Sequence, residues 1–298
     1  MEDTHYYHLF ADGDKSPNFI ICEDDFEAAF NRVGICAAHS PVIILAFNIE
    51  ETHPHFLMHG SYRDCIAFGE MYNRSTVGYM KAQGRKEIGR LSFNIYQVSD
   101  KQYLMNLAAY VIIQPTKDGK GIMPYDYKWG SAPLYFRGKN AVMPWRINHD
   151  GSVSKIITAG ELGLRQIRRI LHSKLSVPGN WHICNGLIMP DSYVAVERFE
   201  RIFGTHNCFR VFQSGGRSSE NEIKQRLSSI AGITISDIDA RAIGEKVCAE
   251  MFKISSAADL NPYQRLRLAQ RLRREYKLSP RQLSAICLMD ESDIRKYA

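Results

Sequence analysis

The sequence lacks any run of roughly 18 or more apolar residues, so we expect no membrane-spanning helix and no membrane partner. Its start has no basic patch followed by an apolar stretch, which argues against a signal peptide. The seven cysteines are scattered, and no Cys-x-x-Cys spacing occurs, which argues against a disulfide framework and a thiolate zinc site. These absences predict a protein of the reducing cytoplasm.

The composition is that of an ordinary globular protein. Of the 298 residues, 45% are hydrophobic and 23% are charged, and this length predicts about two domains. The net charge of +6 is mild. It is compatible with a polyanionic partner but does not by itself establish one.

Three regions differ in their patterns. Residues 1–145 alternate between short β-branched runs and amphipathic segments, residues 146–219 form a connecting region of unclear fold, and residues 220–298 are helical in pattern. In the first region the patterns predict strands over 6–10, 19–22, 42–49, 53–60 and 91–98. They also predict three helices: one capped by Asp24 or Asp25, one with poor caps over 65–82, and one over 101–113.

Two histidines stand one residue apart, at His53 and His55. On a strand, residues i and i+2 share a face, so the two imidazoles form half of a site for a divalent metal. The alternative is that both are surface or packing residues. His59 is either a further ligand or a surface residue, and the turn carboxylates of Glu50 and Glu51 are expected to be solvated.

A helix that begins after Asp100 carries Tyr110 and, four residues later, Gln114. Residues i and i+4 stack on one helix face. The alternative is an amphipathic helix whose core stripe contains Tyr103 and Tyr110. If the helix lies beside the histidines, however, a phenol that attacks a phosphodiester would sit next to a Mg²⁺ or Mn²⁺ ion that neutralises the phosphate.

The sequence resembles the HUH single-tyrosine transposases, and most closely the REP-associated tyrosine transposase branch. The resemblance covers roughly residues 5–135 and is carried by the order and spacing of several segments. These segments are Tyr7–Phe10, Phe26–Cys36, Val42–Phe47, Thr52–Met58, Asp100–Leu104, Ala109–Gly119 and Pro124–Ala132.

The resemblance implies an α+β fold in which residues 1–145 form an HUH catalytic domain with a ferredoxin-like antiparallel sheet. It also implies that His53, His55 and Gln114 bind Mg²⁺ or Mn²⁺ and that Tyr110 is the nucleophile. Two residues depart from the family pattern. Pro54 replaces a bulky hydrophobic residue and predicts a locally irregular strand, and position 114 is Gln where this branch more often has Asn.

Basic residues occur in two places. Arg85, Lys86 and Arg90 form either a phosphate-contacting loop or a solvated charge run. Between 261 and 281 there are seven basic residues and one acidic residue. Asn261 and Pro262 predict a helix start, an apolar stripe falls on Leu266, Ala269 and Leu272, and a final helix is expected from Asp293.

The pattern over 261–298 predicts a helix-turn-helix. Its candidate DNA-binding residues are Arg271, Arg274, Arg281, Arg295 and Lys296. The alternative is a basic helical hairpin that only packs on the first domain.

Together these features predict a metal-dependent DNA single-strand endonuclease and strand transferase. The enzyme would form a 5′-phosphotyrosine intermediate on single-stranded or hairpin DNA. Two alternatives remain: a domesticated, non-catalytic DNA-binding protein, and a metal phosphodiesterase that uses water. The sequence leaves a homodimer open.

Overall fold

The computed structural model describes residues 3–11, 20–85, 90–98, 100–116, 123–138, 141–148, 150–214, 237–254, 256–276, 278 and 280–297. The chain divides into two compact units, Met1–Glu220 and Asn221–Ala298.

The first unit is built on a four-stranded antiparallel sheet. Its strands are β1 (His5–Ala11), β2 (Ile43–Ile49), β3 (Pro54–Gly60) and β4 (Phe93–Gln97), in the order β2-β3-β1-β4. Helix α1 (Glu23–Ala38) joins β1 to β2, and helix α2 (Tyr62–Ala82) joins β3 to β4. This β-α-β-β-α-β order is that of ferredoxin-like folds, so the predicted α+β class with an antiparallel sheet is confirmed.

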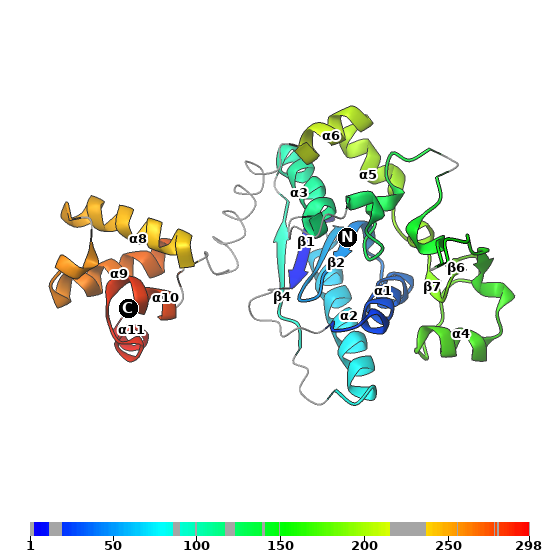
Figure 1. Cartoon of the computed structure of the whole chain (residues 1–298), viewed down its shortest axis with the longest axis horizontal. Coiled ribbons are helices and arrows are strands. Elements are labelled where there is room, and N and C mark those ends of the chain that lie inside the picture. Colours follow the sequence, from blue (N-terminus) through cyan, green and yellow to red (C-terminus); the bar gives the residue numbers. More distant parts are fainter. Residues whose placement is uncertain are drawn as a thin grey trace. The chain divides into compact units, whose positions relative to one another are not determined.

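Helices lie against both faces of the sheet, among them α2 and α3 (Figure 1). Successive side chains of a strand point to opposite faces, so each strand contributes residues to both helical layers. On one face, the Phe56 ring contacts Phe68 and Tyr72 of α2, with centroids 5.3 and 5.2 Å apart. On the opposite face lies α3 (Lys101–Ile113), where Tyr103 meets Tyr96 of β4 at 5.3 Å. The histidine-bearing face of the sheet is therefore the face that α3 covers.

Three local predictions are wrong. Residues 20 and 21 belong to no strand, although the Ile20 amide donates to the Glu51 carbonyl at 3.2 Å, and Phe19 lies outside the described residues. Helix α2 has a good cap, because the Ser61 hydroxyl accepts from the Asp64 amide at 3.1 Å. Strand β3 begins at Pro54, where a missing N–H is tolerated, so His53 lies in the preceding turn.

The outer edge of β2 is covered by residues 127–131. The Ile49 amide donates to the Trp129 carbonyl and the Ser131 amide to the Phe47 carbonyl, both at 2.9 Å. The Tyr127 hydroxyl also donates to the Ile49 carbonyl at 2.6 Å. This segment satisfies backbone groups that an exposed edge strand would leave to other chains.

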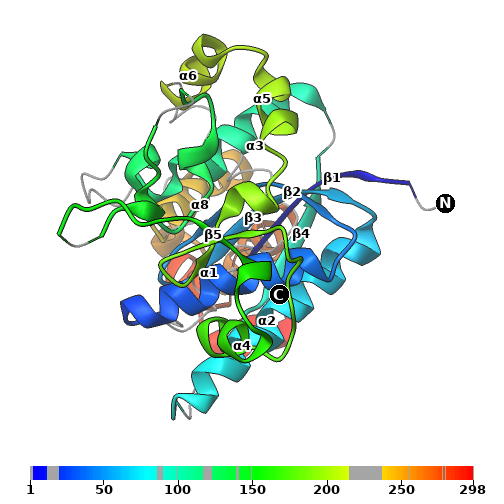
Figure 2. The same ribbon diagram turned by 90° about the vertical axis from the view of Figure 1, so that its right-hand side faces the viewer.

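Residues 146–214, for which the sequence predicts no clear fold, add two small modules to the first unit (Figure 2). One contains a three-stranded sheet and helix α4, and its buried side chains pack with Ile35 of α1. The other is a helical pair beside α3. The elements are β5 (Ile157–Thr158), α4 (Leu164–Leu171), β6 (His182–Cys184), β7 (Leu187–Ile188), α5 (Val196–Phe203) and α6 (His206–Ser214).

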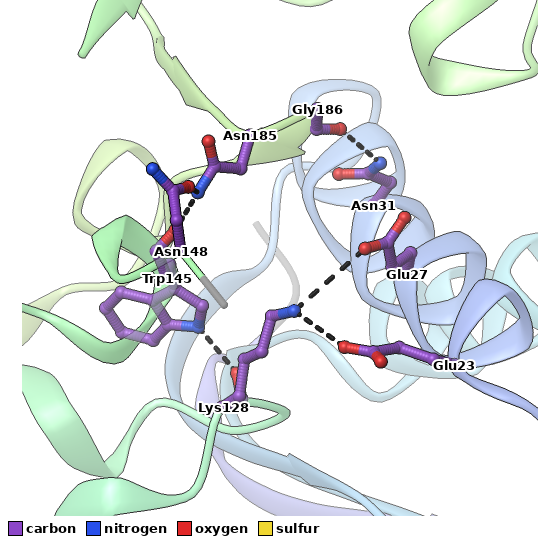
Figure 3. Close-up of polar contacts among 8 residues, drawn as sticks. All are labelled: Glu23, Glu27, Asn31, Lys128, Trp145, Asn148, Asn185 and Gly186. Atoms are coloured by element: carbon purple, nitrogen blue, oxygen red, sulfur yellow. Dashed lines mark hydrogen bonds and ion pairs between the residues drawn. The ribbon is translucent and has the colours of Figure 1, made fainter. Parts of the chain in front are cut away.

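Polar contacts join α1 to Lys128 and to the region of residues 146–214 (Figure 3). The Asn31 amide group donates to the Gly186 carbonyl at 2.9 Å, and its oxygen accepts from the Ile188 amide at 2.8 Å. Lys128 forms ion pairs with two carboxylates of α1 at 3.0 and 4.0 Å, and its carbonyl accepts from the Trp145 indole. The first unit therefore extends well beyond the region in which the sequence predicts the catalytic domain.

The second unit is helical where it is described. Its long helices are α8 (Asp237–Phe252) and α9 (Pro262–Tyr276), followed by the shorter α10 (Pro280–Cys287) and α11 (Glu291–Tyr297). Asn261 caps α9 as predicted, since its side chain accepts from the Gln264 amide at 2.9 Å.

Two details of the second unit correct the sequence predictions. The buried stripe of α9 contains Leu268 in addition to Ala269 and Leu272, whereas Leu266 is only half-buried. The final helix begins at Glu291 and not at Asp293.

Within the described part of the chain, no helix combines the length and the apolar character that crossing a bilayer requires.

Candidate metal centre

The turn between β2 and β3 brings one carboxylate and two imidazoles together. The Glu50 amide donates to the His53 carbonyl at 3.2 Å, which closes the turn. Glu50, His53 and His55 each offer one ligand atom, and these atoms all lie within 4.8 Å of one another. Hairpin geometry therefore builds a compact group of metal-ligand atoms from six consecutive residues.

Neighbouring side chains orient two of these groups. The Asn48 amide donates to Glu50 Oε1 at 2.9 Å. His53 Nδ1 lies 2.6 Å from the Thr52 hydroxyl, and His53 Nε2 lies 3.6 Å from Glu50 Oε2. The Nε2 atom of His53 and the second oxygen of Glu50 therefore face each other.

A third histidine, His8 of β1, lies next to His55 on the same face of the sheet. His8 Nε2 is 3.0 Å from His55 Nδ1, and the side chains of both residues are buried. Burial lowers the pKa of His8 to about 3, because a charged imidazole is costly away from water. His8 is therefore neutral and forms part of the floor of the site.

Helix α3 places Tyr110 against the same imidazoles. The Tyr110 ring centroid is 5.7 Å from that of His55 and 6.3 Å from that of His8, both edge to face. The helix is fixed at its start by Asp100, whose carboxylate accepts from the Tyr103 amide at 2.7 Å. Only 6% of Tyr110 is exposed, so most of this residue lies under other atoms.

Gln114 stands at the C-terminal end of α3, one turn after Tyr110, and 9% of it is exposed. The structure brings His53, His55 and Tyr110 together and adds Glu50 to them. The sequence predicts solvated carboxylates in this turn. That prediction is wrong for Glu50, whose side chain is 15% exposed and held by Asn48.

The donor set fits a divalent cation. Two neutral imidazoles and one carboxylate are ligands that Mn²⁺ and Zn²⁺ accept, whereas Mg²⁺ prefers oxygen ligands alone. Ligand atoms less than 4.8 Å apart can share one ion at ordinary bond lengths. A cation held by Glu50, His53 and His55 would supply positive charge beside the Tyr110 ring.

The predicted phosphate loop is placed only in part. The Arg85 guanidinium pairs with the Asp25 carboxylate at 2.5 Å, so it is engaged within the first unit. Arg90 is exposed, and Lys86 lies outside the described residues.

The predicted DNA-binding residues of the second unit differ in their surroundings. Arg271 pairs with Glu250 at 3.2 Å. Arg274, Arg281 and Lys296 are exposed, and the side chain of Arg295 lies outside what the structure describes. Helices α10 and α11 are separated by residues 288–290, and their assignment as a helix-turn-helix stays a prediction.

Sequence reasoning missed two members of the site, Glu50 and His8. A signal for Glu50 existed, because a hairpin turn places residue i beside residue i+3. His8 carried no such signal, since its contact with His55 depends on the pairing of β1 with β3.

No family model matches this sequence, and no curated protein is significantly similar to it. A solved structure of a REP-associated tyrosine transposase bound to a REP hairpin is similar over 44% of this chain and 77% of that chain. The identity is 13% and the TM-score is 0.36, values at which the similarity carries no functional argument.

Proposed function

We propose that this protein is a metal-dependent DNA nicking-and-joining enzyme of the transposase type, with Tyr110 as nucleophile. The observation that carries the proposal is the position of the Tyr110 ring, whose centroid lies 5.7 Å from that of His55. His55 is one of the three residues whose metal-ligand atoms lie within 4.8 Å of one another. The sequence resemblance to HUH single-tyrosine transposases supports the same assignment for His53, His55, Tyr110 and Gln114.

The chemistry is a transesterification. The Tyr110 oxygen attacks a backbone phosphorus, a Tyr110 O–P bond forms, and the P–O3′ bond breaks. The phenolic proton leaves to a base, and the departing 3′ oxygen takes up a proton. The products are a 5′-phosphotyrosine and a free 3′-OH, and the preserved ester allows a second strand to be joined.

Access to Tyr110 distinguishes the proposed enzyme from a protein that binds DNA without cutting it. Glu50 and His53 form a partly exposed rim, with side chains 15% and 25% exposed, whereas Tyr110 is 6% exposed. The low exposure of Tyr110 leaves little of this residue open to a phosphodiester that approaches from solvent. This burial favours the second candidate, a transposase-derived protein that binds DNA without cutting it.

The substrate we propose is single-stranded or hairpin DNA, because a phenol that attacks one strand needs that strand accessible. Helices α9 to α11 would hold the DNA through phosphate contacts, since this segment carries most of the excess basic charge. Residues 1–145 would then act as the catalytic domain, residues 146–219 as a connecting region and residues 261–298 as the helix-turn-helix.

The test is incubation of the full chain with end-labelled single-stranded DNA and Mn²⁺, followed by denaturing gel electrophoresis. We expect a covalent protein–DNA adduct that is lost in Tyr110→Phe. Tyr103→Phe is the matched control, because it removes one phenolic hydroxyl from a buried position on the same helix. This control should keep the adduct.

Two other outcomes would contradict the proposal. Tight DNA binding by the wild type without any adduct supports the non-catalytic alternative. Cleavage that survives Tyr110→Phe supports a metal phosphodiesterase that uses water.

A further inference from the structure

The pairing of β1 with β3 sets two histidines in register for a hydrogen bond. Phe10 is opposite His55 in the antiparallel ladder, so His8 and His55 are diagonal neighbours on the same face of the sheet. The two imidazole rings are nearly parallel, 14° apart, with centroids at 5.2 Å. Phe10 stacks on His8 at 4.6 Å and on His55 at 6.0 Å. This wall of rings restrains both imidazoles.

The hydrogen bond between His8 Nε2 and His55 Nδ1, at 3.0 Å, allows only one proton between the two atoms. If His55 Nδ1 carries that proton, the lone pair of His55 is on Nε2, and Nε2 can bind a cation. If His8 Nε2 carries it, His55 Nε2 is protonated and cannot bind one. The partner at Nδ1 therefore decides whether His55 is a competent ligand.

We propose that His8 is a positioning residue that accepts the Nδ1 proton of His55 and so holds His55 as an Nε2 ligand. This inference rests on the proposed metal centre. His8 Nδ1 supports it, because this atom is buried and has no hydrogen-bond partner among the described residues. A buried polar atom without a partner destabilises the fold, so a core residue chosen for packing alone would not be histidine.

The arrangement differs from the usual support of a metal-binding histidine. Such a histidine ordinarily donates its second N–H to a carboxylate, a carbonyl or water. Here the acceptor is a second, fully buried imidazole. His53 has a different support, the Thr52 hydroxyl at 2.6 Å, so the effect of His8 should fall on His55 alone.

The test measures Mn²⁺ binding to the full chain by electron paramagnetic resonance, which counts free Mn²⁺ and needs no DNA. The variants are His8→Leu, which removes the acceptor, and His8→Gln, whose amide oxygen can stand where His8 Nε2 stands. Phe10→Leu is the matched control, because it alters packing on both rings and leaves the hydrogen bond. Circular dichroism checks that each variant is folded.

We expect His8→Leu to weaken Mn²⁺ binding about 10- to 100-fold, the range for second-shell partners of metal-binding histidines. His8→Gln should restore binding to within about threefold of the wild type, and Phe10→Leu should change it less than His8→Leu does. The inference is overturned if His8→Leu binds Mn²⁺ like the wild type, or if His8→Gln is as weak as His8→Leu.

The experiment separates this inference from the proposed function. A wild type that binds Mn²⁺ and loses affinity only in His8→Leu supports the role of His8 even if no DNA adduct forms. A wild type that binds no Mn²⁺ overturns the metal centre and this inference together.

Discussion

Replacing Asn31 with alanine should destabilise the first unit, because this side chain ties α1 to the small sheet of residues 146–214. Its amide group donates to the Gly186 carbonyl (Figure 3), and its oxygen accepts from the Ile188 amide. Asn31→Ala removes both bonds at once. A methyl group cannot replace either of them.

The expected loss of stability follows from the burial of the two backbone groups. Ile188 is fully buried. Its amide would be left without a partner and away from water, which costs the full desolvation penalty of about 1–3 kcal/mol. Gly186 is half-buried, so water can replace part of the hydrogen bonding of its carbonyl. The loss of this bond therefore lowers stability by only about 1 kcal/mol. We therefore expect Asn31→Ala to lower the free energy of unfolding by about 2–4 kcal/mol.

Tryptophan fluorescence isolates the unit concerned. The three tryptophans, Trp129, Trp145 and Trp181, all lie in the first unit. Urea unfolding followed by this signal therefore reports on that unit alone. With a typical urea slope of about 2–3 kcal/mol per molar for a unit of this size, the midpoint should fall by about 0.7–2 M.

The control is Asn148→Ala, which removes two hydrogen bonds at the surface and one that is part-buried, so that water can replace most of what is lost. We expect it to cost less than about 1 kcal/mol. If Asn31→Ala shifts the midpoint no more than Asn148→Ala does, the two buried bonds do not hold the small sheet on α1 and the reasoning is wrong.

Two further predictions concern other buried groups. Burial raises the pKa of the Cys36 thiol to about 12 from an ordinary value of 9.0, so above pH 9 only the unfolded chain releases this proton and stability falls as pH rises from 9 to 12. At pH 10 the free energy of unfolding should be about 1.4 kcal/mol lower than at pH 8, a loss that Cys36→Ala should not show. Urea midpoints measured by tryptophan fluorescence at pH 8 and pH 10 check this. An equal change of stability with pH in both proteins would contradict it. In the second unit, the Arg265 guanidinium donates to the carbonyls of Ala257, Ala258 and Leu260 at 2.9–3.1 Å, so Arg265→Lys should destabilise that unit by about 2–3 kcal/mol. Thiol labelling of the buried Cys248 and Cys287 should speed up in Arg265→Lys and stay unchanged in the exposed control Arg267→Lys. Equal labelling rates in the two variants would show that the hydrogen bonds of Arg265 to these carbonyls do not stabilise the unit.

Local patterns were enough to predict the four strands of the main sheet and helices α1 to α3, although the strand expected over 19–22 is absent. The β-branched run over 42–49 and the alternation over 53–60 correspond to β2 and β3, and the Asp100 cap marks the start of α3. Strand alternation and helix capping act over a few residues, so they can be read from the sequence. The pairing of His53 with His55 and that of Tyr110 with Gln114 are spacings of the same local kind.

Residues 146–214 could not be read in this way. Their strands are two or three residues long, too short for an alternation pattern to appear. The buried side chains of α4 belong to a hydrophobic cluster that also contains Ile35 of α1, more than a hundred positions away in the sequence. Only the folded chain supplies such a partner, because the apolar surface that buries α4 belongs to another part of the sequence.

The sequence by itself determined which residues can do chemistry, namely the imidazoles, the phenol and the carboxylates near the hairpin turn. The tertiary structure decided which of them meet. It placed α3 on the histidine face of the sheet, brought His8 within 3.0 Å of His55, and left Tyr110 buried beside both. The physical reason is that strand register and helix docking depend on packing summed over the whole sheet, and no short segment of the chain contains that information.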